Sequence, residues 1–207
     1  MFRNVLLVVL FWSTTTFAAQ AMDIPEKGEI CTGCHGVDGK GQTGIAPMLA
    51  GLNIEYMEAQ LTLFSSDKRH SVLMKGIADG LNDPQARLEV LEYFSSLPTW
   101  EFTKLEQRGS QADITNPYRK LVYQGDWDRN IPACSTCHGA SGMGVDKFPR
   151  LASQQADYLQ NQLHAWKNGT RSGDPLNMMG SIAKKLTDTE IENLSYYFAS
   201  FRYEESK

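Results

Sequence analysis

Apolar residues recur every three or four positions in two segments, which predicts amphipathic helices over about 53–64 and 158–166. These stripes contain Ile54, Met57, Leu61 and Phe64 in the first segment, and Leu159, Leu163 and Trp166 in the second. The helix-start signals Asn82-Asp83-Pro84 and Thr187-Asp188-Thr189-Glu190 predict two more helices, which end near Leu97 and Phe201. Because no segment alternates convincingly as a strand does, the sequence predicts an all-α fold.

The chain also repeats itself. Cys31-Thr32-Gly33-Cys34-His35-Gly36 returns 103 residues later as Cys134-Ser135-Thr136-Cys137-His138-Gly139. The likeness extends into the predicted helices, where Tyr56, Gln60, Leu61 and Phe64 match Tyr158, Gln162, Leu163 and Trp166 at an offset of 102. Two copies at this period indicate a domain duplication. We expect domains at 22–98 and 118–207, joined by a linker at 99–117 that has little apolar periodicity.

Residues 1–21 resemble an export signal. Arg3 precedes the unbroken apolar run Val5–Trp12, and Ala19-Gln20-Ala21 fits a signal-peptidase site that would cut before Met22. The run is shorter than the roughly 20 residues that span a bilayer, although an uncleaved N-terminal anchor is the alternative. We therefore expect a periplasmic protein.

Composition and charge narrow the function further. With 42% hydrophobic and 21% charged residues, the 207-residue chain is typical of a water-soluble protein. Its net charge of −4 argues against nucleic acid as a partner. The charge is uneven, since 22–98 has 11 acids and 6 bases, whereas 118–207 has 10 and 11. Such an asymmetric field favours docking to charged redox proteins, or it serves only solubility.

The C-x-x-C-H pattern has three possible interpretations. A zinc site would need four ligands, and each domain offers just two cysteines and one adjacent histidine. A thioredoxin-type redox pair normally lies in a βαβ unit, which this sequence lacks. The remaining interpretation is covalent attachment of c-type haem through Cys31 and Cys34, and again through Cys134 and Cys137. On a helix both thiols of each pair would share one face, and His35 and His138 would bind the two irons.

A second axial ligand is expected from methionine, which closes the iron and raises its potential. Met74 and Met179 occupy matching positions, each three residues before an Ile-Ala pair, and they follow the motif histidines by 39 and 41 residues. We predict these two as ligands, with Met178 as the rival in its domain and Met57 as core filler. The carbonyl of Pro47 or Pro149 could accept the other ring N–H of the motif histidine and fix its orientation, and the alternative is that each proline only forms a turn. His70 and His164 have no matching histidine in the other copy, which favours structural roles.

These motifs together resemble the dihaem cytochrome c4 family. The resemblance rests on the paired C-x-x-C-H-G motifs, on Pro47-Met48-Leu49-Ala50 with Pro149-Arg150-Leu151-Ala152, and on the Met-x-x-Ile-Ala segments. It implies two tandem class I cytochrome c domains with His/Met-ligated haems and loose membrane association. One departure is the short lead-in at 22–30 before the first cysteine, which predicts a short or irregular first helix in domain one.

Three functions fit these features. The leading one is a periplasmic electron carrier between respiratory partners, a quinol- or dehydrogenase-side donor and a terminal oxidase or reductase. The second is the cytochrome subunit of a dedicated dehydrogenase, such as a flavocytochrome sulfide dehydrogenase, which the sequence also resembles. The third, a dihaem redox enzyme, ranks lowest because each domain offers a methionine to close its iron. We therefore expect no catalytic residues.

Overall fold

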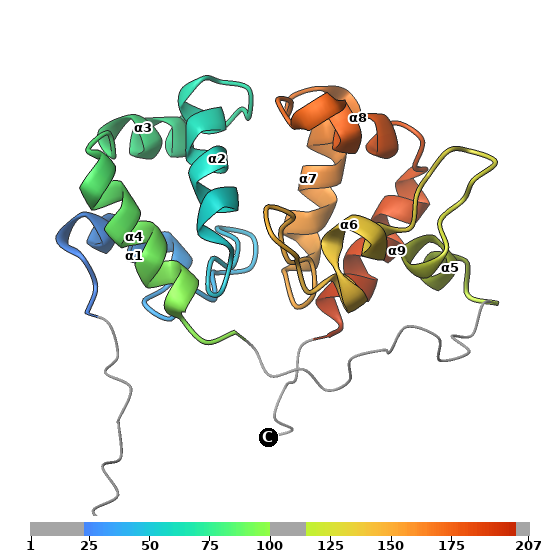
Figure 1. The fold of residues 1–207 in the computed structure, drawn as a ribbon, viewed down its shortest axis with the longest axis horizontal. Coiled ribbons are helices and arrows are strands. Elements are labelled where there is room, and N and C mark those ends of the chain that lie inside the picture. Colours follow the sequence, from blue (N-terminus) through green and yellow to red (C-terminus); the bar gives the residue numbers. More distant parts are fainter. Residues whose placement is uncertain (1–22, 100–114, 202–207) are drawn as a thin grey trace, which may run out of the picture.

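Two helical units lie side by side in the computed structural model, which describes residues 23–99 and 115–201 (Figure 1). We refer to them as the N-terminal unit and the C-terminal unit. The predicted signal segment lies outside the described residues, as do positions 100–114 of the predicted linker. The domain limits at 98 and 118 therefore stay predictions. No helix among the described residues is long and apolar enough to cross a membrane.

Helices supply nearly all the regular structure, as the apolar periodicity predicts, and the described ranges contain only isolated β-bridges in place of strands. The N-terminal unit contains α1 (Glu29–His35), α2 (Ile54–Ser65), α3 (Val72–Gly80) and α4 (Pro84–Ser96). The C-terminal unit contains α5 (Pro117–Tyr123), α6 (Cys134–His138), α7 (Ala156–Asn168), α8 (Met178–Ala183) and α9 (Asp188–Ala199).

Side chains at the predicted positions cap the helices. Asp83 caps α4 by accepting a hydrogen bond from a backbone N–H in its first turn, and Pro84 follows in that turn. Thr187 and Glu190 form the reciprocal capping box of α9, as their spacing predicts. The lead-in to the first motif has only a 3₁₀ turn, Glu26–Gly28, where the C-terminal unit has α5. This agrees with the expectation of an irregular start to the first domain.

The loop after each motif has the same hydrogen bonds in both units. The carbonyl of Gly39 accepts from Leu49 and Ala50, and the carbonyl of Gly142 accepts from Leu151 and Ala152. The motif histidines are followed by Gly36 and Gly139, both at φ 78°, a backbone region that favours glycine. The loop therefore turns back under the histidine in the same way twice, which the sequence repeat leads us to expect.

Each unit has its own hydrophobic core. The N-terminal core gathers Leu52, Met57, Leu81, Val90, Leu91, Tyr93 and Phe94. The C-terminal core gathers Leu121, Val122, Ile131, Ala152, Leu159, Leu186, Ile191, Leu194, Phe198 and Phe201. Separate cores are typical of tandem domains.

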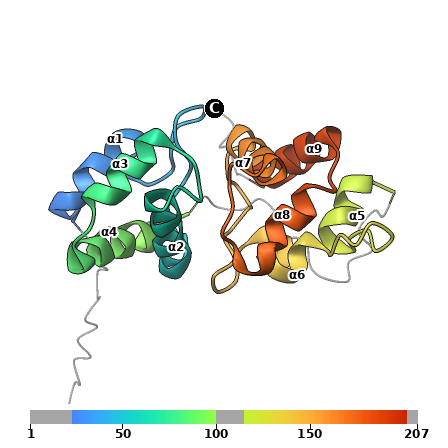
Figure 2. The same cartoon turned by 90° about the horizontal axis from the view of Figure 1, so that it is seen from above.

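Helices α2 and α7 are the inner helices, and they face each other across the boundary between the units (Figures 1 and 2). A short antiparallel bridge at Arg69 and Arg171 lies beside them. Polar contacts cross the boundary elsewhere too, since the side-chain amide of Gln154 pairs with both the N–H and the carbonyl of Met48, each at 3.0 Å. The two units therefore share a polar, hydrogen-bonded interface.

Candidate haem-binding sites

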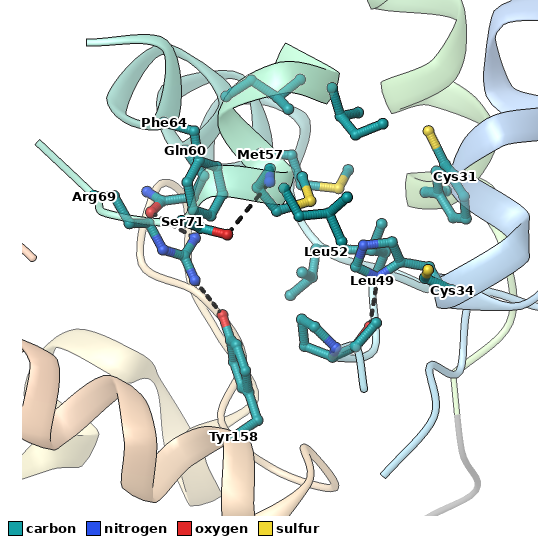
Figure 3. Close-up of a pocket in the computed structure, with 18 of the residues that line it drawn as sticks. Cys31, Cys34, Leu49, Leu52, Met57, Gln60, Phe64, Arg69, Ser71 and Tyr158 are labelled. Carbon is teal, nitrogen blue, oxygen red and sulfur yellow. Dashed lines mark hydrogen bonds between the residues drawn. The ribbon is translucent and has the colours of Figure 1, made fainter. Parts of the chain in front are cut away.

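The first C-x-x-C-H motif forms one wall of a cavity of about 550 Å³. Cys31 and Cys34 lie one turn apart on α1 and face this cavity, with Met57 on its far side (Figure 3). His35 ends the helix and is buried, and its Nδ1 lies 2.8 Å from the carbonyl oxygen of Pro47. The wall therefore presents two thiols and one fixed imidazole to an apolar space, as a C-x-x-C-H haem site requires.

The second motif has the same local geometry. Cys134 and Cys137 lie one turn apart on α6, and His138 ends that helix, buried. Its Nδ1 lies 2.9 Å from the carbonyl oxygen of Pro149. Both proline carbonyls thus contact the motif histidines and fix the rotation of their rings.

These contacts define the state of each imidazole. A carbonyl oxygen only accepts, so Nδ1 carries the proton and Nε2 is left with its lone pair. Burial is the largest influence on both rings, and it lowers the pKa of His35 and of His138 below the usual value. Both rings are therefore neutral at pH 7. Each has a free lone pair on Nε2, and this is the form of imidazole that binds iron.

None of the four cysteines is joined to another in a disulfide, so both pairs are available for thioether bonds. In the polypeptide before haem attachment, burial raises the pKa of Cys31 and raises the pKa of Cys134 to about 11. Among residues 23–99 and 115–201, no three His, Cys, Asp or Glu side chains gather where they could hold a metal ion.

The predicted methionines lie at the starts of matching helices. Met74 lies in the first turn of α3 and lines the cavity. Met178 and Met179 are both half-buried at the start of α8, so burial does not separate the two candidates. Met57 is buried in the N-terminal core, as expected.

A pair of arginines closes the cavity at the boundary between the units. Arg69 donates to Gln60, Tyr158 and Gln162, and Arg171 donates to Gln162, Tyr56 and Gln60. Each guanidinium also stacks on an aromatic ring of its own unit, Phe64 for Arg69 and Trp166 for Arg171. Each arginine therefore links the inner helices of both units, in a nearly two-fold arrangement.

Both guanidinium groups are buried, and neither pairs with a carboxylate in the described ranges. The Nε of Arg171 has no hydrogen-bond partner there, and burial together with the nearby Arg69 lowers the pKa of Arg171. Burying two unpaired cations side by side is costly, so the cavity favours an occupant that is apolar over most of its surface and anionic at this end. A haem fits, because it is a flat apolar ring with two carboxylates on one edge.

Sequence reasoning missed Arg69 and Arg171. Their signal was present, because the two arginines are separated by the same 102 residues as Tyr56 and Tyr158.

The two histidines outside the motifs lie away from the motif cysteines in the sequence, and structural roles were expected for both. His70 is exposed beside Asp67, and His164 is half-buried on α7.

Comparisons with known proteins agree with this geometry. The family model described as Cytochrome c matches residues 120–201. The "Thiosulfate dehydrogenase electron acceptor" of Thiomonas intermedia (strain K12) is 34% identical, over 96% of this chain and 91% of its own. Cytochrome c4 of Thiocapsa roseopersicina is 32% identical, over 87% of this chain and 94% of its own. The crystal structure of reduced recombinant cytochrome c4 from Pseudomonas stutzeri superposes with a TM-score of 0.73 at 29% identity, over 87% of this chain and 99% of its own.

The two cytochrome c4 matches each cover 87% of this chain and 94% and 99% of the relatives' own lengths, so the likeness extends over both units. The chain carries two covalently bound c-type haems, and its two cysteine pairs, Cys31 with Cys34 and Cys134 with Cys137, fit two C-x-x-C-H haem-binding motifs. It therefore belongs to the cytochrome c4 family of dihaem electron-transfer proteins.

Proposed function

We propose that this protein is a periplasmic electron carrier that accepts electrons from a dehydrogenase and passes them to a respiratory oxidase or reductase. In each unit the motif histidine and one methionine would hold the iron, His35 with Met74 and His138 with Met179. The haem iron supplies one-electron chemistry, cycling between the ferric and ferrous states. The single observation that carries the proposal is the twofold occurrence of a buried, neutral, carbonyl-anchored histidine beside two thiols.

The chain's own residues keep each site rigid. The carbonyls of Pro47 and Pro149 fix the rotation of the two imidazoles and hold the Nδ1 proton, so Nε2 stays available as a ligand in both oxidation states. Met74 and Met179, as iron ligands, would exclude small exogenous ligands, which suits electron transfer better than catalysis on substrates.

The interface between the units supports electron exchange within the molecule. Arg69 and Arg171 hold the inner helices together through paired hydrogen bonds to the other unit. Their buried positive charges make this boundary the place where haem carboxylates are best accommodated. Arg69 and Arg171 would therefore hold haem carboxylates at this boundary, where the haems would supply one-electron exchange within the molecule.

The choice of donor rests on the relatives. The name "Thiosulfate dehydrogenase electron acceptor" belongs to a protein that this chain matches over 91% of that protein's length. We extend this role to the present chain, so its donor is a dehydrogenase that oxidises thiosulfate. A dedicated dehydrogenase was the second function considered from the sequence, and we propose thiosulfate rather than sulfide as the substrate of that dehydrogenase.

The proposal is tested by mixing oxidised holoprotein with thiosulfate, with and without a purified thiosulfate dehydrogenase. We expect both haems to be reduced only when the dehydrogenase is present, at a rate that depends on its concentration. Reduction of the holoprotein by thiosulfate alone would make the chain itself an enzyme. Failure of the dehydrogenase to reduce either haem would remove the proposed donor.

A further inference from the structure

The two predicted axial methionines differ in the side chain that caps them. In the N-terminal unit, Ser71 caps α3, and its hydroxyl oxygen accepts from the N–H of Met74 at 3.3 Å (Figure 3). In the C-terminal unit, Oδ2 of Asp174 accepts from the N–H of Met179 at 2.6 Å. The same backbone group is therefore held by a neutral oxygen in one site and by a carboxylate in the other.

The carboxylate of Asp174 has little around it to neutralise its charge. Its other oxygen, Oδ1, is buried and has no hydrogen-bond partner among the described residues. None of the ion pairs in the described ranges involves Asp174. Because Asp174 is half-buried and pairs with no cation in the described ranges, solvent screens its charge only in part.

The backbone between Asp174 and Met179 is shaped for this contact. Leu176 and Asn177 adopt left-handed φ values of 57° and 51°, a region that asparagine tolerates and that is unfavourable for leucine. The turn brings the carboxylate back over the first turn of α8, and the N–H of Asn177 also bonds to the carbonyl of Asp174 at 3.1 Å. Strain of this kind persists where the surrounding contacts require it.

We propose that Asp174 is a positioning residue for Met179 and that its charge lowers the reduction potential of the C-terminal haem. This inference rests on the proposed ligation by Met74 and Met179. The iron centre gains one positive charge on oxidation, so a nearby negative charge stabilises the oxidised form. Ser71 holds Met74 without this charge. The difference between the two capping side chains therefore lowers the potential of the C-terminal haem relative to that of the N-terminal haem.

The Asp174→Asn variant of the holoprotein tests the inference, because asparagine keeps an oxygen acceptor of the same shape and removes the charge. Met179→Ala identifies which redox step belongs to the C-terminal haem. In a spectral redox titration we expect Asp174→Asn to raise the potential of that haem and to change the equilibrium for exchange between the haems about tenfold, or 59 mV for a one-electron couple. The methionine–iron band near about 695 nm should keep its intensity.

Two further variants sharpen the result. Ser71→Asp should lower the potential of the N-terminal haem, and Glu192→Gln, at an exposed position on α9, controls for a change in net charge. If Asp174→Asn shifts the potential no more than Glu192→Gln does, the inference is wrong although the ligation stands. If Met179→Ala keeps the 695 nm band at full intensity (about two haems), the proposed ligation itself fails.

Discussion

The contact between Gln154 and Met48 offers a sharp test of the interface. The Gln154 side chain is 3% exposed and satisfies both backbone groups of Met48 across the boundary between the units. Gln154→Ala leaves the N–H and the carbonyl of Met48 without partners across the boundary, and within its own unit it also removes the acceptor of the Gln155 N–H. Each such group costs about 1–3 kcal/mol, so the two groups of Met48 cost about 2–6 kcal/mol in the intact interface. Because water reaches the gap if the units part slightly, we expect a loss near the lower bound, about 2 kcal/mol.

The assay is guanidinium unfolding of the oxidised holoprotein, followed by haem absorbance and by far-ultraviolet circular dichroism. Asn161→Ala is the control, since it also removes a side-chain amide, and Asn161 is exposed on the neighbouring helix α7. We expect Gln154→Ala to lower the transition midpoint clearly, whereas the control stays within about 0.5 kcal/mol of the parent. Equal midpoints for the two variants would refute the view that this amide pairing holds the units together.

Three more predictions concern charge and covalent attachment. Arg129 holds the pKa of Glu190 below its usual range, so the stability from this pair is present above the unfolded-state pKa of about 4.3 and is lost as pH falls through the folded pKa. Glu190→Gln should cost about 1–2 kcal/mol in denaturant unfolding at pH 7, and the difference from the parent should close towards pH 3. Arg171→Gln removes a buried cation from the cavity beside the first motif, so the reduction potential of the N-terminal haem should fall. The fall, measured by spectroelectrochemistry, should correspond to a free energy of about 1–2 kcal/mol at an effective dielectric constant near 20. Replacing both Cys31 and Cys34 by alanine should reduce covalently bound haem to about half, measured as the haem-to-protein ratio after denaturation.

The sequence was a good guide wherever a residue's role is local. Helix starts at Pro84 and Thr187 follow from capping chemistry that acts within one turn, and the structure confirms both. The carbonyls of Pro47 and Pro149 were expected beside the histidines because the repeat places both prolines at nearly the same distance from the motif. The core role of Met57 followed from its place in an apolar stripe.

The interface was harder to predict because it depends on how two units meet. Arg69 and Arg171 lie in short polar segments whose composition suggests solvent exposure, yet both are buried against the other unit. Gln154 likewise has no matching glutamine in the first copy, since position 52 is leucine. The choice between Met178 and Met179 also stays a prediction, because both begin the same helix.

One measurement tests the central claim most directly, and it is a redox titration of the purified holoprotein with full visible spectra. We predict two one-electron steps, and in the oxidised protein a methionine–iron band near about 695 nm with the intensity of two haems. High-spin features or rapid binding of an added ligand at either haem would contradict His/Met ligation at both sites, and with it the assignment as an electron carrier.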